Sequence, residues 1–143
     1  MVRGIAVLRA RTTLPKREGT QYTMRIGIPK ERREHELRVA ASPDTVKRYK
    51  GLGLDPVVER GAGQGAAIPD QAFADAGATL VDGPDEVWAS DIVLKVRPPT
   101  DEETGRLRQG QILIGMLEPY TSREQLGAYA EKGVRAFALE LLP

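Results

Sequence analysis

The sequence predicts a doubly wound α/β domain, with about six strands in a mostly parallel, Rossmann-like or flavodoxin-like sheet and helices on both faces. From Met24 onward, short apolar runs alternate with segments that carry helix-capping residues and helix-ending glycines. Nearly continuous apolar runs are typical of strands buried on both faces, and helices between them favour parallel crossovers. Such sheets bind ligands beyond the carboxyl ends of their strands, near the point where the strand order reverses.

Each element has its own signal. Ser42 and Pro43 are typical of a helix N-terminus, and Gly51 ends that helix. Ser122 and Gly133 are expected to cap and to end the last helix in the same way. The expected strands are 25–28, 55–60, 78–81, 91–96, 111–116 and 134–140, and the expected helices are 42–53, 69–77, 84–90, 100–110 and 122–133.

Composition and charge limit the function classes. The 143 residues are one domain's length, and 41% of them are hydrophobic and 29% charged. A net charge of +1 and 5% aromatic residues give no sign of a nucleic-acid or anionic membrane surface. The chain has no cysteine and one histidine, which excludes a disulfide framework, a thiolate metal site and a histidine-rich metal site. No apolar run approaches the roughly 18 residues that a membrane helix needs.

Residues 1–23 are basic and lack the apolar core of a secretory signal. We expect this extension to be either a disordered basic arm or upstream sequence translated from a misassigned start. The strand that begins directly after Met24 favours the second alternative. The fold argument therefore covers residues 24–143.

Several segments follow strand ends and are expected to cluster on one rim of the sheet, among them Arg38 and Lys95. Lysine near the end of an apolar strand is costly to bury without an anionic partner, so Lys95 either has one or extends its ammonium to the rim. Together Arg38 and Lys95 would form a two-point clamp for a carboxylate or phosphate, since arginine supplies a planar fork and lysine a point charge. Ordinary solvated surface remains the alternative for Arg38.

The segment GAGQGA, Gly61–Ala66, has the spacing of a dinucleotide-binding loop, and an acidic residue, Asp82, ends the next strand. Phosphate binding needs the third small residue inside the first turn of a helix. Pro69 intervenes here and makes Asp70 the start of a separate helix. We therefore interpret the segment as a glycine-rich turn that lets the backbone pass close to its neighbours.

Two further residues are candidate acid–base groups. His35 lies between two glutamates in the charged run that follows the first strand, a pattern typical of solvated surface. Glu118 follows the fifth strand at a rim position, but no second carboxylate is paired with it in the sequence. Surface is therefore the default interpretation for both.

The chain resembles the N-terminal domain shared by alanine dehydrogenases and the α subunit of proton-translocating NAD(P) transhydrogenase. The segments that carry the resemblance are MRIGIPKERREHELRVAASPDTV, VVERGAGQGAAIPDQAFADAGA, VWASDIVLKVRPP and VRAFALELLP. It implies that Arg38 and Lys95 correspond to residues that bind the substrate carboxylate in alanine dehydrogenases. Those enzymes also use a histidine after the fifth strand, where this chain has Glu118, which favours the transhydrogenase branch.

The resemblance implies the N-terminal part of the NAD(H)-binding α subunit of a transhydrogenase, which passes hydride from NADH to NADP⁺ and couples this to proton translocation. We expect residues 24–143 to be truncated before the NAD-binding domain and inactive alone, with no cofactor-binding or catalytic residue and no metal site. Arg38 and Lys95 would line the cleft, with Glu118 at its rim. NADP(H) would bind a partner component.

The resemblance implies three partners: the remainder of the α subunit, a membrane-bound β subunit and a second copy in a homodimer. It implies a location on the cytoplasmic side of the inner membrane. No nucleic-acid partner is expected. Two alternatives stay open: the N-terminal domain of an alanine dehydrogenase or related amino-acid dehydrogenase, and a non-catalytic module that binds a small anion.

Overall fold

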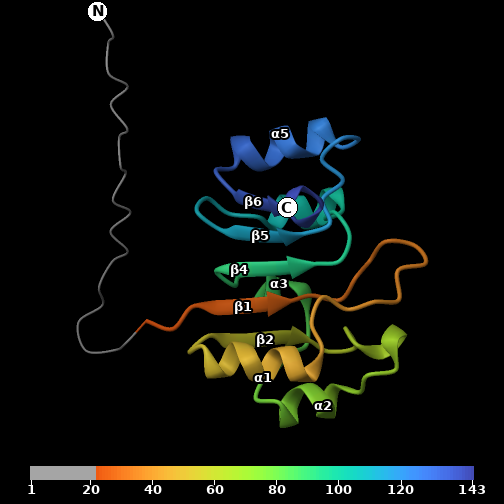
Figure 1. Cartoon of the computed structure of the whole chain (residues 1–143), viewed down its shortest axis with the longest axis vertical. Coiled ribbons are helices and arrows are strands. Elements are labelled where there is room, and N and C mark those ends of the chain that lie inside the picture. The colour runs from red at the N-terminus through yellow and green to blue at the C-terminus, as the bar shows by residue number, and fades with distance from the viewer. Residues whose placement is uncertain (1–21) are drawn as a thin grey trace, which may run out of the picture.

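The computed structural model describes residues 22–143, so the prediction for the extension 1–23 lies almost wholly outside the described part. Six parallel strands form one sheet in the order β3-β2-β1-β4-β5-β6 (Figure 1), which confirms the predicted fold class. The strands are β1 (Arg25–Ile28), β2 (Asp55–Glu59), β3 (Thr79–Val81), β4 (Ile92–Lys95), β5 (Ile112–Gly115) and β6 (Arg135–Ala138). The order reverses between β1 and β4, so the expected ligand crevice lies where these two strands end.

Helices cover the sheet from two sides because alternate residues of each strand point to opposite faces. In β2, Val58 joins the core beneath α1 and α2, which contains Val46 and Phe73, while Val57 joins the opposite core with Trp88. The helices are α1 (Pro43–Gly51), α2 (Asp70–Asp75), α3 (Pro84–Trp88), α4 (Asp101–Arg106) and α5 (Arg123–Glu131), with 3₁₀ turns η1 (Gln64–Ala66) and η2 (Leu139–Leu141).

Two details of the helices differ from the sequence prediction. Helix α4 ends at Arg106 rather than at residue 110, because Leu107 turns to an extended conformation and is buried in the core. Ser42 caps α1 through a bond from the Thr45 N–H, but the Ser122 side chain makes no such bond at the start of α5. Ser42 has the extended backbone of an N-cap residue (φ −87°, ψ 164°), whereas Ser122 does not (φ −112°, ψ 44°).

Candidate functional site

The candidate site lies at the carboxyl ends of β1 and β4, where the strand order reverses (Figure 1). The loop after β1 contains Arg38, and β4 itself ends at Lys95. Both residues therefore stand on the same rim of the sheet, as the sequence predicted. Their immediate partners, however, are acidic side chains of this chain.

Lys95 is fully buried and paired with two carboxylates. Its ammonium lies 2.9 Å from Glu31 Oε2 and 3.2 Å from Glu103 Oε1, and its side chain is 0% exposed. The same ammonium lies 5.9 Å from the centre of the Trp88 ring, a favourable cation–π distance. Lys95 thus has the anionic partner that burial requires, and its ammonium does not extend to solvent.

Glu31 ties the loop after β1 to the end of β4. Its Oε1 accepts a hydrogen bond of 2.7 Å from the Val96 N–H, and its Oε2 accepts a longer one of 3.5 Å from the Arg97 N–H. Glu103 is held from the other side by a capping box, in which it exchanges hydrogen bonds with Thr100 at the start of α4. Both carboxylates are therefore fixed before any ligand arrives.

Arg32, which is exposed, and the buried Glu59 extend this network toward β2. The Arg32 guanidinium donates to both Glu59 oxygens, at 2.5 and 3.1 Å, and the Lys30 N–H donates to Glu59 at 2.9 Å. The hydrogen bond with Glu59 raises the pKa of Arg32. Glu59 ends β2, the position where dinucleotide-binding sheets place an acidic residue for the ribose. Here its oxygens are already occupied by the chain's own donors.

Arg38 forms a two-point pair with Glu36 instead of meeting Lys95. The guanidinium donates to both Glu36 oxygens at 2.8 Å, and the Arg38 N–H adds a third bond of 2.9 Å. The hydrogen bonds from Arg38 lower the pKa of Glu36 to about 2. The Arg38 side chain remains 68% exposed, beside a cavity of about 270 Å³ that Glu31 also lines. Glu31 therefore adjoins both candidate cations without bringing them into contact.

Glu118 lies on the rim, as predicted, and is paired with a cation. Its Oε1 is 3.0 Å from Arg97 Nη2 and 3.1 Å from Arg97 Nε. The backbone at Glu118 has a positive φ of 51°, and the N–H groups of Leu117 and Glu118 donate to Glu140. Burial alone would raise the pKa of Glu140. The hydrogen bonds that Glu140 accepts from backbone N–H groups outweigh burial, so the pKa is lowered.

His35 is far more exposed than a buried acid–base group would be. Its side chain is 89% exposed and lies 3.3 Å from Glu34, with a positive φ of 62°. This agrees with the surface interpretation. As His35 is the one histidine of the sequence, the chain places no imidazole after β5.

The glycine-rich segment Gly61–Ala66 does not have the geometry of a dinucleotide-binding loop. Its third small residue lies in the short turn η1, and α2 begins separately at Asp70. A Cβ on Gly63 would lie 2.6 Å from the Ile68 carbonyl oxygen, and one on Gly65 would lie 2.8 Å from that of Leu37. The interpretation as a turn for close backbone passage is confirmed, and these residues do not fit the pyrophosphate of NAD.

Sequence reasoning missed the acidic partners Glu31, Glu36 and Glu103. The spacing from Thr100 to Glu103 is a capping-box pattern that could have identified the last of them.

Within residues 22–143, no group of three acidic or histidine side chains could hold a metal ion. No helix in that part of the chain has the length and apolarity to span a bilayer.

Comparison with known proteins identifies the relatives of this domain. The family model described as alanine dehydrogenase/PNT, N-terminal domain, matches residues 27–143. The NAD(P) transhydrogenase subunit alpha of Haemophilus influenzae is 39% identical over 120 residues, which are 84% of this chain and 23% of that protein. The alanine dehydrogenase of Mycobacterium tuberculosis is 43% identical over 118 residues, 82% of this chain and 32% of that protein.

A solved structure from the same group of relatives is also similar to this chain. The crystal structure of transhydrogenase from Sinorhizobium meliloti superimposes with a TM-score of 0.80 at 41% identity, and covers 83% of this chain and 36% of that one. The chain therefore spans about a quarter to a third of the length of the curated relatives above, at 23% and 32%.

Proposed function

The chain belongs to the alanine dehydrogenase/PNT N-terminal domain family, and from this premise we propose that it is part of the NAD(H)-binding α subunit of a proton-translocating NAD(P) transhydrogenase. The whole enzyme would transfer hydride from NADH to NADP⁺ and couple the transfer to proton movement. The described residues would form one wall of the cleft in which the nicotinamide reacts. Positioning and exclusion of water are the contributions that a protein makes to hydride transfer.

The observation that carries the choice of transhydrogenase is the rim after β5. There the chain has Glu118, paired with Arg97 at 3.0 Å, and its one histidine is an exposed loop residue elsewhere. An amino-acid dehydrogenase needs a group that moves a proton to and from its substrate. A carboxylate at this place is a poor substitute for imidazole, because Arg97 already occupies its Oε1 with two contacts.

Arg38 would line the cleft wall, and Lys95, which is fully buried, would hold that wall from within. Glu36 already pairs with Arg38, and Glu31 and Glu103 already pair with the buried Lys95, so the wall keeps its shape without a ligand. Glu118 would stand at the cleft rim. NAD(H) would bind to another part of the α subunit, since the glycine-rich loop and the occupied Glu59 do not suit a dinucleotide.

The assembly that we propose has the remainder of the α subunit, a membrane-bound β subunit and a second α subunit as partners. NADP(H) would bind on the β side. The α subunit would then be held at the cytoplasmic face of the inner membrane by its partners.

Deletion of the coding sequence in the source organism tests the function. Membranes of the deletion strain should lose NADPH-dependent reduction of an NAD⁺ analogue, and complementation should restore it. Alanine-dependent reduction of NAD⁺ in the same extracts should be unchanged. Loss of the alanine-dependent reaction, with hydride transfer between nicotinamides retained, would instead identify an amino-acid dehydrogenase.

That second candidate is favoured by one observation, the 43% identity with a mycobacterial alanine dehydrogenase. The chain also has Arg38 and Lys95, the two residues that the resemblance matches to carboxylate binding in alanine dehydrogenases. Substitution of Glu118 by histidine in the full-length protein provides a separate test. If the chain supports amino-acid dehydrogenation, E118H should raise that activity well above the background of the parent.

A further inference from the structure

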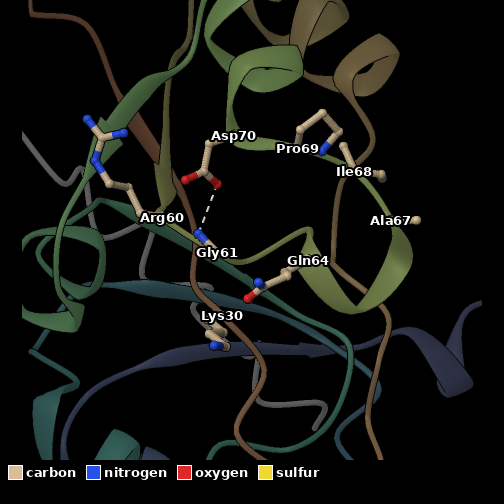
Figure 2. A pocket seen from close by; sticks show the side chains of 8 residues that line it. All are labelled: Lys30, Arg60, Gly61, Gln64, Ala67, Ile68, Pro69 and Asp70. Carbon is tan, nitrogen blue, oxygen red and sulfur yellow. Dashed lines mark hydrogen bonds between the residues drawn. The ribbon is translucent and has the colours of Figure 1, made fainter.

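A cavity of about 640 Å³ lies beyond the carboxyl ends of β1 and β2, outside the Arg38 and Lys95 pairs (Figure 2). Lys30, which follows β1, and Gly61, which follows β2, line it together with Gln64 of η1. The rim that holds ligands in parallel sheets therefore has a second hollow, next to the switch point.

Lys30 differs from the other cations of this rim. In the segments after β1, β2 and β4, each other lysine and arginine has a side-chain hydrogen bond or ion pair: Arg32 with Glu59, Arg33 with the Pro98 and Pro99 carbonyls, Arg38 with Glu36, Arg60 with Asp82, Lys95 with Glu31 and Glu103, and Arg97 with Glu118. Among the described residues, no carboxylate lies within 4.0 Å of the Lys30 ammonium. The chain thus leaves one positive charge of this rim without an internal counter-ion, at the cavity.

The glycine at position 61 keeps the space beside this ammonium open. Gly61 has a positive φ of 77°, and a Cβ there would lie 3.8 Å from Lys30 Nζ and 3.8 Å from Gln64 Oε1. Figure 2 shows the Gln64 side chain reaching toward the space between Gly61 and Lys30, with its amide oxygen on the side of Lys30. In the described structure neither the Lys30 ammonium nor the Gln64 amide has a hydrogen-bond partner, and both border one small volume.

The rest of the lining limits the charge and shape of a ligand. The Asp70 carboxylate faces the same cavity, where its Oδ1 accepts a hydrogen bond of 2.8 Å from the Gly61 N–H. Arg60 also lines the cavity, but its guanidinium is paired with Asp82 at 2.7 Å, so Lys30 is left to balance a single negative charge on a ligand. A second negative charge would be repelled by Asp70. Ala67, Ile68 and Pro69 supply an apolar wall.

We propose that Lys30, Gln64 and the apolar wall form a binding site for a small monoanion with a short apolar body, of the short-chain monocarboxylate class. The carboxylate contacts the Lys30 ammonium, and the Gln64 amide, whose Oε1 now faces this space, turns its nitrogen toward the carboxylate. The apolar body lies against Ile68 and Pro69. The site adjoins the cavity beside Arg38, because Lys30, Gly61 and Gln64 line both hollows, but binding there does not depend on the proposed function.

Titration of the full 143-residue chain with butyrate, at constant ionic strength, tests the site through backbone amide shifts in NMR spectra. Saturable shifts are expected at Gly61 and Gln64. The K30Q variant should weaken butyrate binding roughly tenfold, since a charged hydrogen bond is lost. The matched control is K47Q, at an exposed lysine of α1, which should bind butyrate like the parent.

Two other ligands sharpen the result. Acetate should bind several-fold more weakly than butyrate, because it buries less apolar surface. Inorganic phosphate should also bind more weakly, because of Asp70. The proposal is overturned if butyrate gives no saturable shift, if K30Q binds it as tightly as K47Q, if the shifts centre on Arg38, or if phosphate or acetate binds as tightly as butyrate.

Discussion

At the scale of single residues, the rim is organised by carboxylates that hold its cations in place. Lys95 can be buried because Glu31 and Glu103 pair with its ammonium. Arg38 is oriented because its Nε and Nη2 donate to the two oxygens of Glu36. Glu36 and Arg38 lie in one loop, Glu31 joins that loop to the end of β4, and Glu103 joins the end of β4 to α4. The shape of the candidate cleft wall therefore depends on acidic residues that pair with the chain's own cations.

Replacement of Glu31 by alanine tests this dependence. It removes one counter-ion of a fully buried ammonium and the acceptor of the Val96 N–H, so we expect the free energy of unfolding in urea to fall by about 3 kcal/mol. The control is E34A in the same loop, whose side chain is 87% exposed and whose loss should cost little. Equal stabilities of the two variants would contradict a structural role for Glu31.

The Glu36 pair predicts a pH dependence. Arg38 lowers the pKa of Glu36 from 4.5 to about 2, so the folded state binds this proton less readily than the unfolded state does. The pair's contribution to stability is therefore fully present above pH 4.5 and is lost as the pH falls toward 2. The stability gap between the parent and R38Q should close over this range. R48Q, at an exposed arginine of α1, should show a gap that does not change with pH in this way.

At the scale of elements, the sequence predicts a serine N-cap for each of the two longest helices, α1 and α5. Ser42 accepts a hydrogen bond from the Thr45 N–H, whereas the Ser122 side chain caps nothing. We expect S42A to lower the free energy of unfolding by about 1 kcal/mol, the usual cost of a lost N-cap. S122A is the matched control and should have almost no effect. A larger loss for S122A would mean that α5 is capped in solution.

Elements with strong local signals were predictable from the sequence, and contacts between distant segments were not. The apolar runs, with prolines and glycines at the ends of elements, predicted the alternation of strands and helices, because these signals act within a few residues. The end of α4 was missed because burial of Leu107 overrides local helix preference. The pairing of Lys95 with Glu31 was also missed, since it joins residues 64 positions apart (95 minus 31) through the fold.

At the scale of the whole molecule, the sheet has a Rossmann-like strand order but its dinucleotide position is filled by protein groups. The donors Arg32 and Lys30 occupy Glu59, and the glycine-rich segment forms a turn with no following helix at its third small residue. We expect no measurable NADH binding by the 143-residue chain in a fluorescence or calorimetric titration. Tight, saturable binding would show that one of these two features opens in solution.

The last strand of the sheet leaves apolar surface uncovered. On β6, Phe137 is 51% exposed, and in the segment that follows, Leu141 and Leu142 are 55% and 62% exposed. Edge strands with exposed apolar side chains favour pairing with other chains, because they offer both unpaired backbone groups and a hydrophobic contact. We therefore expect the isolated chain to self-associate as its concentration rises, in sedimentation velocity or light scattering.

The double variant F137S/L141S should reduce this association, because it removes apolar area from the edge without touching either core. L52S, at an isolated apolar residue that is 76% exposed after α1, is the matched control and should associate like the parent. A parent chain that remains monomeric over a wide concentration range, with one cooperative melting transition, would mean that the edge is protected by its own twist and polar neighbours. Association that persists unchanged in F137S/L141S would place the contact on another face of the molecule.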